Sequence, residues 1–324
     1  MSSAKFYKYL RINRNLYNTI INGELFFSNP RVFNDPFDSY PRLKTTKDKK
    51  LAHNLFDLLK KYINSEEEFV KRSNGFEKLN TTLNTILKYW NSHMSFDLYT
   101  PSNESRDNKL IELFTFYNHD NIYDKLLELD SISLQNKMFQ DFLFLMIDFK
   151  NYGILCGSST PSCPVMWGHY ADNHRGVCLE FELLDEEGND SFCFSKDDNY
   201  DIGIVEYTDE PIDILNLPLK KVAEIDKKLL TTKSKRWSYE NEVRLITRKQ
   251  GLFKFKRNSL VSAIFGCKST RKDRYSVCAL LKNMGYKSPY LIAKMQPDIY
   301  EMKIDQMILN DVAGAGFHWE ELNL

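Results

Sequence analysis

The chain has 324 residues, with 44 basic and 44 acidic side chains, so its formal charge is +0 and its pI is near 7.0. This balance removes any bulk electrostatic attraction to nucleic acid or to a membrane surface. Hydrophobic residues make up 42% and aromatic residues 14%, which is a globular composition and excludes collagen, coiled coil and a largely disordered chain. At roughly 150 residues per domain, the length allows two domains, or one large domain with an insertion.

The sequence predicts a cytoplasmic protein without a membrane segment. A central apolar stretch, residues 142–147, is bounded by Asp141 and Asp148 and is far shorter than the ~20 residues of a spanning helix. The first 14 residues lack the apolar core of a secretory signal. Six cysteines are scattered without a Cys-x-x-Cys pair, which is typical of reduced thiols in a cytoplasm.

Residues 1–44 predict the N-terminal part of an α+β core. A helix over residues 15–22 is stopped by Gly23 and followed by a strand over residues 24–28. A turn-rich stretch then contains the motif Phe33-Asn34-Asp35-Pro36-Phe37-Asp38. Asn and Asp before Pro favour a fixed turn, because their side chains bond nearby backbone amides. This turn is either purely structural or presents Asp35 or Asp38 and two Phe rings to a pocket.

Residues 45–150 predict a helical insertion. They are nearly free of Gly and Pro, and apolar side chains such as Leu51, Leu55 and Leu58 recur at helical spacing. The predicted helices are amphipathic, so each has an apolar side that faces a core and a polar side that faces solvent. The insertion is either a scaffold or a surface for a partner protein or an oligomer contact.

Residues 151–324 predict the C-terminal part of the α+β core, in which strands and helices alternate. Apolar and polar residues alternate over residues 177–183, which is the pattern of a half-buried strand. A short lysine-rich spot at residues 233–236 is predicted to be a solvated face. The further predicted strands are residues 202–207, 239–247, 260–265 and 290–293, and the predicted helices are residues 219–230 and 270–284, the latter ended by Gly285.

A short helix is predicted to begin near Pro164 and to expose Trp167, His169 and Tyr170 before Gly176 turns the chain into the next strand. His169, His174 and Cys163 are side chains of the kind that bind metal ions. The spacing matches no zinc pattern, and histidines five residues apart do not align on a helix face. No metal site is therefore predicted.

Two glutamates lie close together in the segment Trp237-Ser238-Tyr239-Glu240-Asn241-Glu242-Val243-Arg244. In a strand, Glu240, Glu242 and Arg244 share one face. Neighbouring carboxylates repel each other, so either Arg244 offsets their charge or the pair awaits a cationic reaction centre. An exposed, salt-bridged strand face is the alternative.

Four motifs follow one another along the chain outside the helical block. They are Tyr7-Lys8-Tyr9, residues 33–38, residues 166–170 with residues 176–179, and residues 237–246. In this order they resemble a bacterial family, the domain of unknown function 2971 (DUF2971). That resemblance implies no activity.

A second resemblance does imply one. The chain has a basic or aromatic segment before a helix, Gly-x-Leu and a strand, and later an aromatic-Pro-Phe turn and a Glu-x-Glu segment. This order is similar to the layout of toxin-type ADP-ribosyltransferases. Those enzymes bind NAD+ between two small sheets. The resemblance implies that Glu242 is the catalytic glutamate and Glu240 an accessory acid, and that Tyr170 or Trp167 stacks on nicotinamide. Lys8 stands where that family often has a histidine. The implied NAD+ contacts are Tyr7, Lys8, Tyr9, Arg11, Asn34, Asp35, Phe37, Trp167, His169 and Tyr170.

We therefore expect an α+β protein with a mixed-sheet, ADP-ribosyltransferase-like core and a helical insertion. The resemblance implies an NAD+-dependent ADP-ribosyltransferase or NAD+-consuming effector of an antiphage defence or toxin system, with a protein, a nucleic acid or water as acceptor. Two alternatives remain open. One is a nucleic-acid-cleaving effector that uses Asp35, Asp38, His169 and Glu240, and the other is a non-catalytic module that binds a partner through the helical block.

Overall fold

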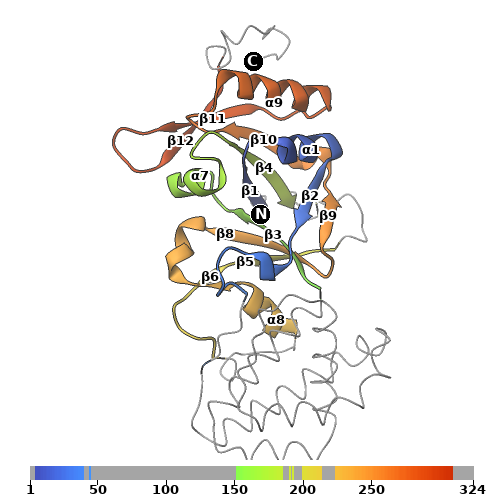
Figure 1. Ribbon diagram of the computed structural model, residues 1–324, viewed down its shortest axis with the longest axis vertical. Helices are drawn as coiled ribbons and strands as arrows, with labels where there is room; N and C mark the ends of the chain where they lie inside the picture. Colours follow the sequence, from blue (N-terminus) through green and yellow to red (C-terminus); the bar gives the residue numbers. More distant parts are fainter. Residues whose placement is uncertain are drawn as a thin grey trace, which may run out of the picture. The chain divides into compact units, whose positions relative to one another are not determined.

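The computed structural model describes residues 4–39, 44, 151–184, 190, 192, 199–213 and 223–308 (Figure 1). The chain divides into two compact units. The first comprises Met1–Val32, Tyr152–Tyr207 and Lys233–Leu324, and the second comprises Phe33–Asn151 and Thr208–Thr232. The predicted helical insertion at residues 45–150 lies outside the described residues and stays a prediction.

The first unit is built on an eight-stranded mixed sheet with the strand order β12-β11-β10-β4-β1-β3-β8-β5 (Figure 1). Neighbouring strands are antiparallel, except for β10 and β11, which are parallel and joined through helix α9. The described residues therefore have an α+β architecture. The strands are β1 (Ala4–Leu10), β3 (Gly153–Ser158), β4 (Val177–Leu184), β5 (Asp201–Ile204), β8 (Glu242–Thr247), β10 (Leu260–Phe265), β11 (Tyr290–Met295) and β12 (Met302–Gln306).

Two of the helices begin at residues that accept capping hydrogen bonds with their side chains. Helix α1 (Arg14–Asn22) is capped by the side chain of Asn13 and ends at Gly23, whose φ of 66° is left-handed. Helix α9 (Arg271–Asn283) is capped by Thr270. The predicted helices at residues 15–22 and 270–284 are thus confirmed. The remaining elements are α7 (Pro164–Tyr170), α8 (Ala223–Leu230, in the second unit), β2 (Glu24–Phe27), β6 (Glu206–Tyr207), β7 (Thr232–Lys233) and β9 (Gly251–Lys254).

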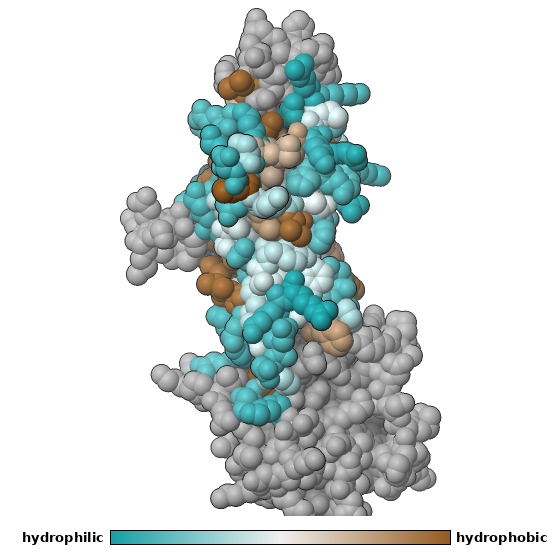
Figure 2. All heavy atoms as spheres, turned by 90° about the vertical axis from the view of Figure 1, so that its left-hand side faces the viewer, coloured by the Kyte–Doolittle hydropathy of each residue, from teal (hydrophilic) through white to brown (hydrophobic). Residues whose placement is uncertain are grey.

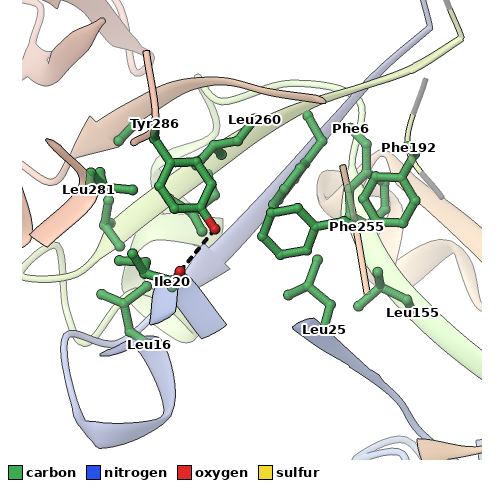
Figure 3. Close-up of a cluster of buried hydrophobic side chains, with 14 of the residues drawn as sticks. Phe6, Leu16, Ile20, Leu25, Leu155, Phe192, Phe255, Leu260, Leu281 and Tyr286 are labelled. Atoms are coloured by element: carbon green, nitrogen blue, oxygen red, sulfur yellow. Dashed lines mark hydrogen bonds between the residues drawn. The ribbon is translucent and has the colours of Figure 1, made fainter. Parts of the chain in front are cut away.

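One face of the sheet is covered by α1, α9 and the β2–β9 pair (Figure 1). The core on this face is rich in aromatic rings, and Phe6 from β1 is completely buried in it. Figure 3 shows the hydroxyl of Tyr286 donating a hydrogen bond of 2.9 Å to the carbonyl oxygen of Ile20, which ties the chain after α9 to α1. Burial of this apolar surface is the main stabilising contribution.

The other face is covered by α7, which begins at Pro164 as predicted. Trp167 is completely buried there, packs edge-on against Tyr9 at 5.1 Å and donates its indole N–H to the carbonyl oxygen of Pro161. The expectation that Trp167 is exposed is therefore wrong, because α7 turns this ring toward the sheet. Its stacking on nicotinamide stays a prediction.

None of the helices in the described ranges has the length and hydrophobicity that a membrane-spanning helix requires. Figure 2 shows that apolar side chains on the visible face of the described part form small separate patches among hydrophilic ones.

Candidate functional site

Glu240 and Glu242 come from two different elements. Glu240 ends a 3₁₀ helix (Lys235–Glu240) that is capped by the side chain of Ser234, whereas Glu242 is the first residue of β8. Between them, Asn241 adopts a left-handed conformation with φ of 43°. The predicted strand over residues 239–247 is therefore wrong in its first three residues, and strand alternation does not bring the two carboxylates together.

A buried lysine brings them together instead. The ammonium of Lys233 donates hydrogen bonds of 2.6 Å to Oε2 of Glu240 and 3.0 Å to Oε2 of Glu242. The Lys233 side chain is only 4% exposed, and its Nζ lies 5.0 Å from the centre of the Trp237 ring. The prediction of a solvated face at residues 233–236 is thus wrong for Lys233, because the two carboxylates and the ring compensate for its loss of water.

Arg244 supplies the second positive charge. It is fully buried, and its Nε and Nη2 donate to Oε1 and Oε2 of Glu242 at 2.8 and 3.0 Å. This two-point geometry is the strongest arrangement of an ion pair. Arg244 and Glu242 share one face of β8 because they are two residues apart. The prediction that Arg244 offsets the charge is confirmed for Glu242.

The second oxygen of Glu240 accepts a hydrogen bond of 2.6 Å from the Tyr170 hydroxyl. Tyr170 is also one end of an aromatic row, which we define as Tyr170, His169, Tyr239 and Trp237. Successive ring centres in this row lie 6.2, 5.9 and 6.0 Å apart. His169 is exposed and the three other rings are half-buried, so the row borders the carboxylates on the solvent side.

The surroundings shift the pKa values of the two carboxyl groups in opposite directions. Burial raises the pKa of Glu240 above its ordinary value, against the attraction of Lys233 and the Tyr170 hydrogen bond. Burial also disfavours the Glu242 carboxylate, but Arg244 and Lys233 outweigh it and lower the pKa of Glu242 to about 2. Two neighbouring acids whose pKa values are shifted in opposite directions are the arrangement that acid–base catalysis uses.

We expect the Glu242 ion pair to lose its stabilising effect in acid. Because the folded pKa is below the ordinary 4.5, the contribution is complete above pH 4.5 and falls as the pH approaches about 2. It should shrink by about 2 kcal/mol at pH 3. The measurement is urea unfolding from pH 6 to 3, compared with a Glu242→Gln/Arg244→Met double variant, which lacks this titration. Parallel pH profiles of the two proteins would contradict the expectation.

Strand β1 contributes Lys8 to the surroundings of this cluster. Its ammonium donates a hydrogen bond of 2.6 Å to the carbonyl oxygen of Cys156 on β3, and burial lowers the pKa of Lys8 despite the attraction of Cys156 and Glu242. The Tyr9 hydroxyl is bound to the carbonyl oxygen of Thr160. Arg11 is exposed after the end of β1.

The Tyr7 hydroxyl belongs to a second buried network, centred on Glu180. The Glu180 carboxylate accepts hydrogen bonds from Lys5 at 2.7 Å, from Tyr7 at 3.1 Å and from Ser262. These bonds join β1, β4 and β10 on one face of the sheet. Tyr7 therefore has a structural partner, and its predicted contact with NAD+ stays a prediction.

The motif at residues 33–38 forms the predicted turn. Asp35 accepts a hydrogen bond of 2.9 Å from the backbone N–H of Phe37, and the N–H of Asp38 donates to the carbonyl oxygen of Asp35 at 3.0 Å. The motif belongs to the second unit. Contacts of Asn34, Asp35 and Phe37 with NAD+ stay predictions.

No three His, Cys, Asp or Glu side chains are grouped to hold a metal ion within the described ranges. The nucleic-acid-cleaving alternative stays a prediction.

Sequence reasoning missed two further groups beside the pair. The Tyr207 hydroxyl accepts a hydrogen bond of 2.8 Å from the backbone N–H of Glu242. The Cys156 thiol hydrogen-bonds the Glu242 side chain, and burial raises the pKa of this thiol well above its ordinary value. Both come from segments distant in sequence, and no local pattern marks them.

A comparison with protein-family models matches residues 166–245 to the family described as "Protein of unknown function (DUF2971)". Comparisons with curated proteins and with solved structures found no match. The matched span contains Tyr170, Lys233, Glu240, Glu242 and Arg244, and it leaves out the motifs at residues 7–9 and 33–38. The resemblance to DUF2971 is thus confirmed over residues 166–245.

Proposed function

We propose that the protein cleaves the bond between nicotinamide and ribose in NAD+, as an ADP-ribosyltransferase or NAD+ glycohydrolase. The observation that carries the proposal is the pair of Glu240 and Glu242, two buried carboxyl groups with opposite pKa shifts on one shared lysine. The resemblance to toxin-type ADP-ribosyltransferases adds the expected effector role in antiphage defence or a toxin system.

The proposed reaction needs a fixed negative charge. When the bond between C1′ and the nicotinamide nitrogen breaks, its electron pair leaves with neutral nicotinamide and positive charge develops on the ribose. A carboxylate held nearby stabilises this transition state more than the ground state. An acceptor hydroxyl or water then bonds to C1′ and gives its proton to a carboxylate or to solvent.

The aromatic row supports the choice of substrate. Its rings provide flat, partly exposed surfaces next to Glu240, and the faces of aromatic rings attract cations. The nicotinamide ring of NAD+ is both planar and positively charged. Tyr170 belongs to both the row and the carboxylate cluster, so it would lie where the ring meets the ribose.

We expect the wild-type protein to release nicotinamide from NAD+ and a Glu240→Gln/Glu242→Gln double variant to lose this activity by at least ~10²-fold. A Glu182→Gln variant, which changes a half-buried carboxylate elsewhere on β4, is the matched control and should keep wild-type activity. Circular dichroism establishes that each variant is folded. Nicotinamide is measured by chromatography, and equal release by the wild type and the folded double variant would sink the proposal, as would no release by the wild type.

A further inference from the structure

We infer that Glu240 is the carboxyl group that contacts the substrate and exchanges its proton, and that Glu242 is a positioning residue that holds Lys233 and Arg244. The inference rests on the proposed function and deepens it. It also reverses the roles that the resemblance to ADP-ribosyltransferases implies for the two acids.

Glu242 is fixed on every side. Its residue lies in β8, which is hydrogen-bonded to β3 on one side and to β5 on the other. Both side-chain oxygens are bound to the guanidinium of Arg244, and one of them is also bound to Lys233. A substrate would have to break a two-point bond inside a buried ion pair to reach this carboxylate. Such a group is suited to hold its neighbours.

Glu240 is as buried as Glu242, with 3% and 4% of the two residues exposed, but it has fewer charged partners. It lies at the end of the 3₁₀ helix, outside the sheet, between the exposed Asn241 and the half-buried Tyr239. Its Oε1 accepts a hydrogen bond from Tyr170, which is neutral and half-buried. A ligand that replaces this one hydrogen bond would bind Oε1 of Glu240 beside the aromatic row. No charged pair has to be broken for this step.

The charged neighbours of the two acids support the same assignment of roles. Glu242 has Arg244 and a share of Lys233, whereas Glu240 has only its share of Lys233 as a salt-bridge partner in the described cluster. The fixed negative charge of Glu242 also disfavours ionisation of Glu240. Of the two acids, Glu240 therefore takes up a proton first as the pH falls. Glu242 anchors Lys233, and Lys233 in turn orients Glu240.

The test compares the pH dependence of nicotinamide release between pH 4 and 9. We expect Glu240→Gln to lower kcat by at least ~10²-fold with KM changed less than ~3-fold, as for loss of a group that acts in the transition state. The Glu242→Gln/Arg244→Met double variant removes an anion together with its cation, so no buried charge is left alone. It should lower kcat by up to ~10-fold, and so by less than Glu240→Gln does, as for loss of a residue that only positions its neighbours. The acidic limb of its pH profile should move to lower pH, because Lys233 is then no longer shared with a second carboxylate.

Tyr170→Phe gives a second, milder variant that should fold in any case. It removes a hydrogen bond to the ionised form of Glu240, so the acidic limb of the pH profile of nicotinamide release should move to higher pH. Loss of activity in the folded double variant, or an acidic limb that Tyr170→Phe does not move, would overturn the assignment while the proposed function stands. If the wild type releases no nicotinamide, the proposed function fails and the assignment fails with it. Glu182→Gln again serves as the control.

Discussion

Replacing Arg244 by methionine is expected to destabilise the protein by about 3–5 kcal/mol, because it leaves a buried carboxylate without its main partner. Arg244 is fully buried, and the Glu242 side chain is 4% exposed. Lys233 remains near Glu242, but it is shared with Glu240 and so offsets only part of the lost charge. The measurement is the free energy of unfolding in urea at pH 7.

The Glu242→Gln/Arg244→Met double variant separates the charge effect from the packing effect. Methionine fills much of the space of the arginine stem, and glutamine has the shape of glutamate, so the double variant should regain most of the stability that Arg244→Met loses. A loss below ~1 kcal/mol in Arg244→Met would show that the pair stabilises no more than an exposed salt bridge does.

The elements that sequence predicts best are those with local stop signals. Helix α9 lies between Thr270, which caps it, and Gly285, which has a φ of 80°. Strand β10 has the predicted bounds of residues 260–265. In both cases the signals lie within the element or directly beside it, so no knowledge of distant residues is needed.

The sequence does not predict strand β1, although this strand lies near the middle of the sheet. Its residues alternate between the two covered faces, with Phe6 in one core and Tyr7 and Tyr9 in the other. The intervening Lys5 and Lys8 hide this alternation, because lysine is read as solvent-exposed. Glu180 and the carbonyl oxygen of Cys156, their partners in the fold, come from segments more than 140 residues later.

The candidate site was predictable only in its local part. Glu240, Glu242 and Arg244 lie within five residues, and their charges suggested mutual compensation. The sequence predicts Lys233 as a surface residue, because residue spacing does not show that the 3₁₀ helix brings Glu240 to the Lys233 ammonium. The sequence singles out Tyr170 for its aromatic ring, and the structure adds its hydroxyl as a partner of Glu240. Where long polar side chains are buried, the fold decides their role.

Replacing Gly176 by alanine is expected to destabilise the protein by about 3 kcal/mol or more, because the new Cβ would lie 2.2 Å from the carbonyl oxygen of Leu10. The clash involves backbone on both sides, and neither side is free to move. Leu10 is paired with Val177 in the sheet, and the N–H of Gly176 is bound to the carbonyl oxygen of Ala171 at 2.7 Å.

Gly168 provides the matched control for this glycine, since it lies eight residues earlier in the same motif. A Cβ at Gly168 has no neighbour within 4 Å, and the residue lies inside helix α7, where alanine is favoured over glycine by up to ~1 kcal/mol. Thermal unfolding should therefore show a lower midpoint for Gly176→Ala and an equal or higher one for Gly168→Ala. Equal midpoints for the two variants would mean that β1 and the loop after α7 do not approach each other as closely as the sheet requires. The close approach matters for the site as well, because it joins the strand that carries Lys8 to the end of the helix that carries Tyr170.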